Sequence, residues 1–200
     1  NMSTMDRGGD PKRTAILVSA FTQFSGYGFR RTSMEDIATA AGVSRASLYS
    51  YFGNKEEIFR CLSASVHGQA LADAEAALRA TSGKPDIARR VEGALVARFA
   101  RLQEVVTQSP HGREIYDEDN RLCGDLVLES SARFRALLAS EMRAAGRAGE
   151  VDLKGAGLSA AAAAELIQLG ASGLKQGAPD VATLKKRLRR FVRVFFAGLR

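Results

Sequence analysis

Apolar residues recur along this chain at the three- and four-residue spacing of amphipathic helices, and no stretch shows the sustained alternation of a strand. The first stripe predicts a helix over about residues 12–26. Its apolar members are Ile16, Leu17, Ala20, Phe21 and Phe24. Two short helices follow: one starts after Ser33 and is closed by Gly42, and the other starts after Ser44. Both serines are predicted N-caps, because a serine oxygen can accept a hydrogen bond from the first N–H groups of a helix.

The remaining two thirds of the chain continue the helical pattern. Amphipathic stretches predict helices over about residues 54–79, 87–106, 120–145, 160–174 and 181–199, with a short segment near 115–116. With the three N-terminal helices, these make about nine. The predicted fold class is therefore all-α, with a three-helix helix-turn-helix head at the N-terminus and a helical-bundle core after it.

The two short helices have the spacing of a helix-turn-helix, with Gly42 in the tight turn. If Leu48 packs inward, Arg45 and Ser47 face outward, and Ala46 is small enough for close approach to a partner. An arginine can donate two hydrogen bonds to guanine in the major groove, so Arg45 is the predicted base reader. A solvated helix cap is the alternative role for Arg45.

Three further side chains flank the second short helix and suit a phosphate backbone. They are Tyr49, Tyr51 and Lys55. Two hydroxyls and an ammonium near a helix start can donate to phosphate oxygens, which positions a protein on DNA without reading its sequence. Packing is the alternative role for both tyrosines, because tyrosine is often partly buried.

The run from Thr32 to Phe59, TSMEDIATAAGVSRASLYSYFGNKEEIF, resembles the DNA-binding head of the TetR/AcrR transcriptional regulators, and the resemblance extends over about residues 12–62. It implies that Thr32 and Ser33 lie near phosphate, that residues 44–47 enter the major groove, and that Tyr49, Tyr51 and Lys55 hold the backbone. It also implies an all-helical core that dimerises through its last two helices and encloses a ligand pocket.

Charge supports a polyanion partner only weakly. The formal net charge is +7, and residues 175–200 hold eight Lys or Arg residues but a single Asp. In the last helix these cations lie opposite a wide apolar stripe, which favours packing against a partner helix over a second nucleic-acid or membrane surface. Gly170 and Gly173 would allow close helix approach in the helix before it. The predicted dimer interface is Leu166, Ile167, Gly170, Gly173, Leu188, Phe191 and Phe195.

The core offers no motif that identifies a ligand site. Aromatic, sulfur-containing and apolar side chains of the predicted core helices are the candidates for the pocket, with ordinary core packing as the alternative. They are Phe99, Tyr116, Cys123, Phe134 and Met142. A metal site is not expected. The stretch from His111 to Asp119 has ligand-type side chains, but it holds a single His and no Cys.

Several classes of protein are disfavoured. The chain has no Gly-x-Ser-x-Gly elbow, no phosphate-binding loop and only two histidines, so we expect neither an enzyme nor a cofactor. The two widely separated cysteines fit neither a disulfide framework nor a zinc site, which favours a cytoplasmic setting. No apolar run approaches the length of about 18 residues that a membrane span needs.

We therefore expect a homodimeric, ligand-responsive transcriptional regulator, more often a repressor in this family, that binds palindromic double-stranded operator DNA and is released by an unidentified small molecule. The expected domains are a flexible arm (1–11), a DNA-binding domain (12–67) and a ligand-binding and dimerisation domain (68–200). The alternative is a helical ligand-binding or interaction protein without sequence-specific DNA binding.

Overall fold

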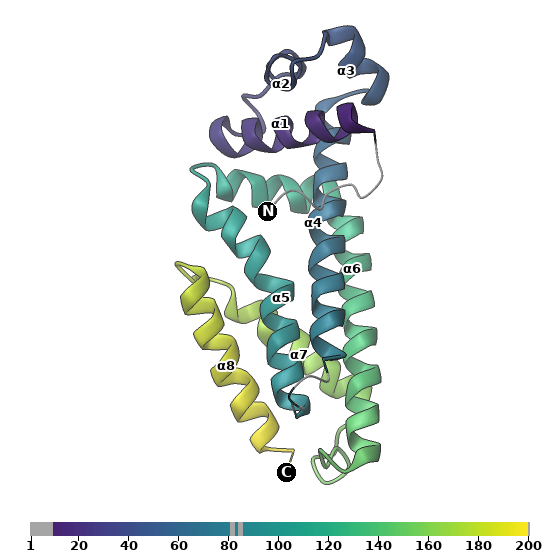
Figure 1. Cartoon of the computed structure of the whole chain (residues 1–200). Coiled ribbons are helices and arrows are strands. Elements are labelled where there is room, and N and C mark those ends of the chain that lie inside the picture. The colour runs from purple at the N-terminus through teal and green to yellow at the C-terminus, as the bar shows by residue number, and fades with distance from the viewer. Residues whose placement is uncertain (1–9, 81–82, 84–85, 200) are drawn as a thin grey trace. The chain divides into compact units, whose positions relative to one another are not determined.

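The computed structural model describes residues 10–80, 83 and 86–199, and within these it contains eight helices and no strand (Figure 1). The predicted all-α class is confirmed. The helices are α1 (Pro11–Tyr27), α2 (Met34–Ala41), α3 (Arg45–Tyr51), α4 (Lys55–Leu78), α5 (Ile87–Gln108), α6 (Gly112–Ala148), α7 (Ala160–Leu174) and α8 (Val181–Ala197). No helix among the described residues is long and apolar enough to cross a membrane.

One boundary differs from the prediction. The short segment near 115–116 and the long helix expected from residue 120 form the single helix α6, which is interrupted at Cys123 by non-helical backbone angles (φ −124°, ψ 17°). A break of this kind redirects a helix without ending it, and the sequence pattern on either side looks like two helices.

The start of the chain shows a local cap. Most of the arm expected over residues 1–11 lies outside the described residues, but Asp10 accepts a hydrogen bond from the backbone N–H of Lys12, and Pro11 is the first residue of α1. Proline suits this position because its missing N–H has no partner in the first turn of a helix.

The chain divides into two compact units. Unit 1 contains residues 10–67 and 105–127, and unit 2 contains residues 68–104 and 128–199. Helices α4, α5 and α6 each continue from one unit into the other, and the boundary in α4 falls between His67 and Gly68. The expected assignment of DNA binding to residues 12–67, and of ligand binding and dimerisation to residues 68–200, stays a prediction.

The interior of unit 1 is formed in part by buried side chains of the first three helices. Ile16 of α1, Ile37 of α2 and Leu48 of α3 are fully buried. Three phenylalanine rings, Phe24, Phe29 and Phe59, pack with centroids 5.2 to 5.8 Å apart. Aromatic pairs at this spacing add to the stability from burial, and here they hold the turn after α1 against the start of α4.

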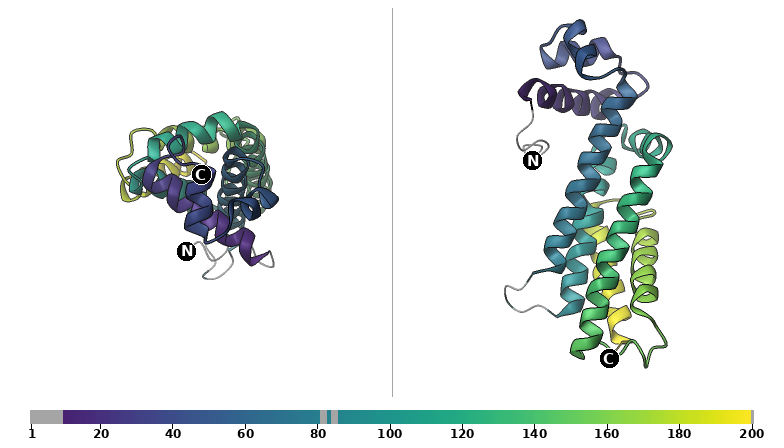
Figure 2. Two further views of the ribbon diagram at one scale, coloured as in Figure 1. Left: turned by 90° about the horizontal axis from the view of Figure 1, so that it is seen from above. Right: turned by 90° about the vertical axis from the view of Figure 1, so that its right-hand side faces the viewer.

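Unit 2 is a bundle of long helices. The first turns of α5 lie beside the C-terminal part of α6, because Arg90 donates to a carboxylate oxygen of Glu141 at 2.6 Å and Ile87 N–H donates to Glu150 at 3.0 Å. Figure 2 shows residues 128–148 of α6 running alongside residues 68–78 of α4. Helices α7 and α8 meet where Gly170 faces the ring of Phe191.

Candidate nucleic-acid interface

The turn between α2 and α3 has the backbone that the sequence predicts. Gly42 adopts the left-handed conformation (φ 67°, ψ 29°), which favours glycine. Ser33 begins α2 with a complete capping box, in which its hydroxyl accepts from the Asp36 N–H and the Asp36 carboxylate accepts from the Ser33 N–H at 2.8 Å. Hydrogen bonds from the hydroxyl and the backbone N–H of Ser33 lower the pKa of Asp36.

Helix α3 packs through Leu48 and leaves its other face exposed. Ser44 caps the helix by accepting from the Ser47 N–H at 3.1 Å. Arg45 is exposed, its guanidinium carbon lies 5.6 Å from the ring centroid of Tyr49, and its Nε lies 3.9 Å from Glu35. Ala46 is exposed beside Arg45. The predicted base reader and its small neighbour therefore share one accessible face.

A basic groove of about 440 Å³ lies beside this face, at the starts of α2 and α4. Its lining includes four cations, Arg30, Arg31, Arg45 and Lys55, and two acids, Glu35 and Glu56. A helix start carries unpaired N–H groups and a partial positive charge, so two helix starts and the excess of cations over acids make an environment suited to phosphate. Arg30 and Arg31 are not among the residues predicted from the sequence, although two adjacent arginines just before the start of a helix are a usable signal.

Two of the predicted phosphate contacts point inward. The ammonium of Lys55 donates to the carbonyl oxygens of Phe29, Arg30 and Thr32 at 2.9, 3.3 and 2.9 Å, and it lies 4.6 Å from the ring centroid of Phe29. The Thr32 hydroxyl donates to the Gly28 carbonyl at 2.7 Å, and Thr32 is 2% exposed. These bonds hold the turn that leads into α2. Direct phosphate contact by either residue stays a prediction.

Tyr51 also forms a hydrogen bond within the protein. Its hydroxyl donates to the carboxylate of Asp10, which raises the pKa of Tyr51 and lowers that of Asp10. Tyr49, by contrast, is 43% exposed and its ring lies beside Arg45. The two tyrosines that the sequence treats alike therefore have different surroundings.

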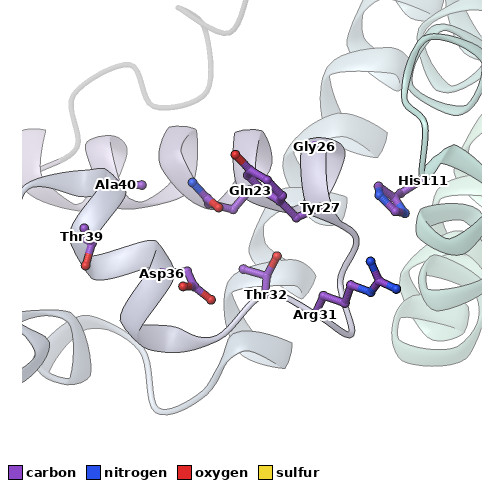
Figure 3. Close-up of a pocket in the computed structure, with 9 residues that line it drawn as sticks. All are labelled: Gln23, Gly26, Tyr27, Arg31, Thr32, Asp36, Thr39, Ala40 and His111. Atoms are coloured by element: carbon purple, nitrogen blue, oxygen red, sulfur yellow. The ribbon is translucent and has the colours of Figure 1, made fainter.

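A second hollow of about 680 Å³ lies between α1 and α2 (Figure 3). Its wall includes Gln23 and Tyr27 of α1, Asp36 and Thr39 of α2, and His111 from the turn before α6. The carboxylate of Asp36 already serves the cap of α2, and the wall carries no cluster of cations like that of the basic groove. The basic groove is the better candidate for a nucleic-acid backbone.

The first turns of α6 hold the turn that supplies Arg30. Glu114 accepts from the Arg30 N–H at 2.8 Å, and Glu118 accepts from Arg30 Nε at 3.2 Å although the Glu118 side chain is only 3% exposed. Gly28 has φ 89°, a backbone conformation that favours glycine, and an added Cβ there would lie 2.5 Å from Glu114 Oε2. Asp119 accepts from Ser63 and lies 3.1 Å from His67 Nε2.

Three acids of the stretch considered for metal binding, Glu114, Glu118 and Asp119, thus interact with residues of unit 1. The described residues contain no group of three or more His, Cys, Asp or Glu side chains arranged to hold a metal ion.

The five pocket candidates do not gather at one place. Phe134 and Met142 are fully buried in unit 2, where Phe99 packs against the same core. Cys123 is fully buried in the core of unit 1, and Tyr116 is 39% exposed there. A pocket in unit 2 could draw only on the first three, and their role as ligand contacts stays a prediction.

The candidates for the dimer interface divide between the surface and the interior. Leu166 is 47% exposed, whereas Ile167 and Leu188 are buried in the core of unit 2. Gly170 contacts Phe191 of the same chain, Gly173 is exposed, and Phe195 is half-buried. Two strongly exposed apolar residues of these helices, Leu169 (59%) and Val194 (69%), are not among the predicted interface residues.

Comparisons with known proteins find sequence matches to the N-terminal helices and structural matches to the whole chain. Residues 16–62 match the family model described as bacterial regulatory proteins, tetR family. The HTH-type transcriptional regulator RutR of Escherichia coli is 46% identical over 48 residues, which cover 24% of this chain and 23% of RutR. The chain thus matches about a quarter of the length of such curated relatives.

Solved structures match over almost the full length. A transcriptional regulator from Cytophaga hutchinsonii superposes with a TM-score of 0.77 at 17% identity, covering 95% of this chain and 99% of that one. SmeT, in its triclosan complex, superposes with a TM-score of 0.71 at 19% identity, covering 96% of this chain and 93% of that one. Residues 16–62 are thus similar to the N-terminal segment of the tetR family of bacterial regulatory proteins, and the helices of the chain have the same arrangement as those of the solved structures.

Proposed function

We propose that this chain is a ligand-responsive transcriptional repressor that binds a palindromic operator as a homodimer and leaves it when a small molecule binds. The observation that carries the proposal is the exposed face of α3, with Arg45, beside the basic groove at the starts of α2 and α4. The first feature suits base edges and the second suits phosphate.

The division of roles on DNA follows from these surroundings. Arg45 and Ala46 would contact base edges, and Arg30, Arg31 and Tyr49 would contact the backbone. Lys55, Thr32 and Ser33 would act mainly by shaping the turn and the start of α2 that carry those contacts. The turn that carries Arg30 and Arg31 must be rigid in this arrangement. If these arginines shifted relative to α3, the protein could not contact the phosphate backbone and the base edges at the same time.

Dimerisation would use the exposed apolar side of α7 together with α8. Leu166, Leu169 and Gly173 lie three and four residues apart on α7, so they form one face, and Leu166 and Leu169 leave apolar surface on it in the single chain. Two heads would then meet two half-sites about 34 Å apart, one helical turn of DNA.

Release by a ligand is supported by the connections between the units. Helices α4, α5 and α6 belong to both units, and the part of α6 in unit 1 bonds to Arg30 at the basic groove. A ligand that shifts α6 in unit 2 would act on that contact, to the extent that it binds the two shapes with different affinity. SmeT, which shares the fold, is a repressor of a multidrug efflux pump and has been solved with triclosan.

The test is a mobility-shift titration of the full-length protein on the DNA upstream of its own gene. We expect a palindromic site bound with two protomers, and much weaker binding to a scrambled sequence of the same composition. Equal affinity for both sequences would contradict sequence-specific regulation and would favour a ligand-binding or interaction protein.

A further inference from the structure

Glu35 and Arg45 form an ion pair on the exposed face of the helix-turn-helix. Glu35 Oε2 lies 3.9 Å from Arg45 Nε, and the two side chains are 63% and 66% exposed. Glu35 belongs to the first turn of α2, and Arg45 is the first residue of α3. Both side chains line the basic groove. A carboxylate of one helix therefore meets the predicted base reader of the other.

The ion pair engages only one edge of the guanidinium. Nε is the donor nearest the stem of the side chain, whereas Nη1 and Nη2 form its outer end. Among the described residues, neither Nη1 nor Nη2 of Arg45 has a hydrogen-bond partner. A guanidinium fork can donate two hydrogen bonds to O6 and N7 of guanine. The contact with Glu35 thus leaves the outer end of Arg45 available for a base.

Tyr49 is a second neighbour of the same guanidinium. The guanidinium carbon of Arg45 lies 5.6 Å from the ring centroid of Tyr49, which is within the range of a cation–π contact. Tyr49 comes four residues after Arg45 on α3, so the two side chains share one face of the helix. A long exposed side chain loses conformational entropy when it is fixed in a complex. Contacts from two helices restrict Arg45 before DNA binds and reduce that loss.

The cap of α2 does not explain the presence of Glu35. The capping box of this helix is formed by Ser33 and Asp36. A carboxylate in a groove that suits phosphate repels the backbone of DNA of any sequence. Glu56 is the other acid of the groove, and it has no ion pair among the described residues. The two acids of the groove therefore differ in one respect, which is the contact of Glu35 with Arg45.

We infer that Glu35 is a specificity-determining residue, which holds Arg45 in the orientation that donates two hydrogen bonds to a guanine of each operator half-site. The inference rests on the proposed function and deepens it. Glu35 is a positioning residue that acts through Arg45 and contacts no base itself. Its negative charge lowers the affinity for DNA in general, and its contact with Arg45 raises the preference for one base.

The first experiment measures base preference with the full-length protein. The probes are the operator found upstream of its own gene and a set of operators in which one base pair of each half-site is changed. Fluorescence anisotropy gives the affinity for each probe, and the position at which Arg45→Ala loses its preference identifies the guanine. Glu35→Gln keeps the shape and removes the charge. We expect it to lower the preference for this guanine about two- to fivefold, the range that an exposed ion pair supplies.

Glu56→Gln is the matched control. It removes the same charge from the same groove, at a residue that has no ion pair with Arg45. Both variants should bind random DNA more tightly by similar factors, because each removes a repulsion of phosphate. Only Glu35→Gln should lower the guanine preference. An unchanged preference in Glu35→Gln, or an equal loss in the two variants, would overturn the inference.

The second experiment tests whether Glu35 acts through Arg45. Glu35→Gln is combined with Arg45→Ala, and the double variant is measured on the same set of operators. If Glu35 only positions Arg45, the double variant has the base preferences of Arg45→Ala alone. A further loss of preference at any base pair would show that the carboxylate contacts a base itself, as when it accepts from cytosine, and would overturn the positioning role.

Failure of the inference can be distinguished from failure of the proposed function. Equal affinity of the wild type for operator and scrambled DNA would contradict the proposed function, and the inference with it. Specific operator binding in which Arg45→Ala changes no base preference would contradict the inference and leave regulation by operator binding in place. The same holds if Glu35→Gln keeps the guanine preference of the wild type.

Discussion

The ammonium of Lys55 donates a 2.9 Å hydrogen bond to the carbonyl oxygen of Thr32, which ties the first residue of α4 to the residue before the cap of α2. Two further carbonyls of the same turn accept from this ammonium. The positive charge at the start of α4 therefore stabilises the turn that leads into α2, and this turn forms part of the wall of the basic groove.

Replacement of Lys55 should destabilise the protein. In Lys55→Met the apolar stem remains but three charge-assisted hydrogen bonds are lost, and we expect the free energy of unfolding to fall by about 2 kcal/mol. Urea unfolding followed by circular dichroism measures this. Lys186→Met, at an exposed position of α8, should change stability by less than about 0.5 kcal/mol. A Lys55→Met protein as stable as the wild type, with a salt slope of DNA binding reduced by about one, would assign this side chain to phosphate instead.

Replacement of two arginines of the basic groove should affect the preference for operator over random DNA differently. Arg45→Ala should cost about 1–3 kcal/mol of binding free energy at the operator and relax one base preference, because it removes a base contact. Arg31→Ala should weaken operator and random DNA by similar factors, since phosphate contacts carry no sequence information. Fluorescence anisotropy titrations on both DNAs compare the two variants. The reverse pattern would exchange the two roles.

The exposed face of α7 should be required for the dimer. Leu169→Glu places a charge where we expect a desolvated contact, which costs several kcal/mol, so light scattering should find a monomer. Leu128→Glu is the matched control, because Leu128 is 73% exposed on α6, and it should leave the dimer intact. If Leu169→Glu stays dimeric at low micromolar concentration, the interface lies elsewhere on the chain.

The ion pair between Arg60 and Asp125 should make unit 1 sensitive to acid. Arg60 donates to both carboxylate oxygens at 2.9 and 2.7 Å, and chiefly these bonds lower the pKa of Asp125 from 3.8 to about 2. A carboxylate with a lowered pKa stabilises the fold above its unfolded pKa of 3.8, and this contribution is lost as the pH falls through about 2.

Asp125→Asn should therefore unfold at lower urea concentration than the wild type at neutral pH, and the two midpoints should converge as the pH is lowered from 3.8 toward 2. Both side chains are partly exposed, so added salt should narrow the difference at neutral pH as well. A difference that stays constant over the whole pH range would mean that the aspartate acts through packing alone.

Local features of the head were predictable from the sequence because their causes lie within a few residues. Ser33 and Ser44 cap helices through N–H groups three residues away, and Gly42 is needed by the backbone of its own turn. The apolar stripe with Ile16 and the anchor Leu48 follow from helical periodicity. The family model matches residues 16–62, the segment that contains these features.

Contacts between distant segments were decided only by the tertiary structure. Lys55 turns inward because carbonyl oxygens of a turn 23 to 26 residues before it are within reach of its ammonium. Glu118 meets Arg30 across 88 residues of sequence, a pairing that no periodicity encodes. The pattern of α7 likewise shows two adjacent apolar residues, Leu166 and Ile167, but only packing within unit 2 determines that Ile167 is buried and Leu166 is exposed. The periodicity of the sequence determines which side chains share a face of a helix. Which face is covered depends on the other helices that pack against it in the tertiary structure.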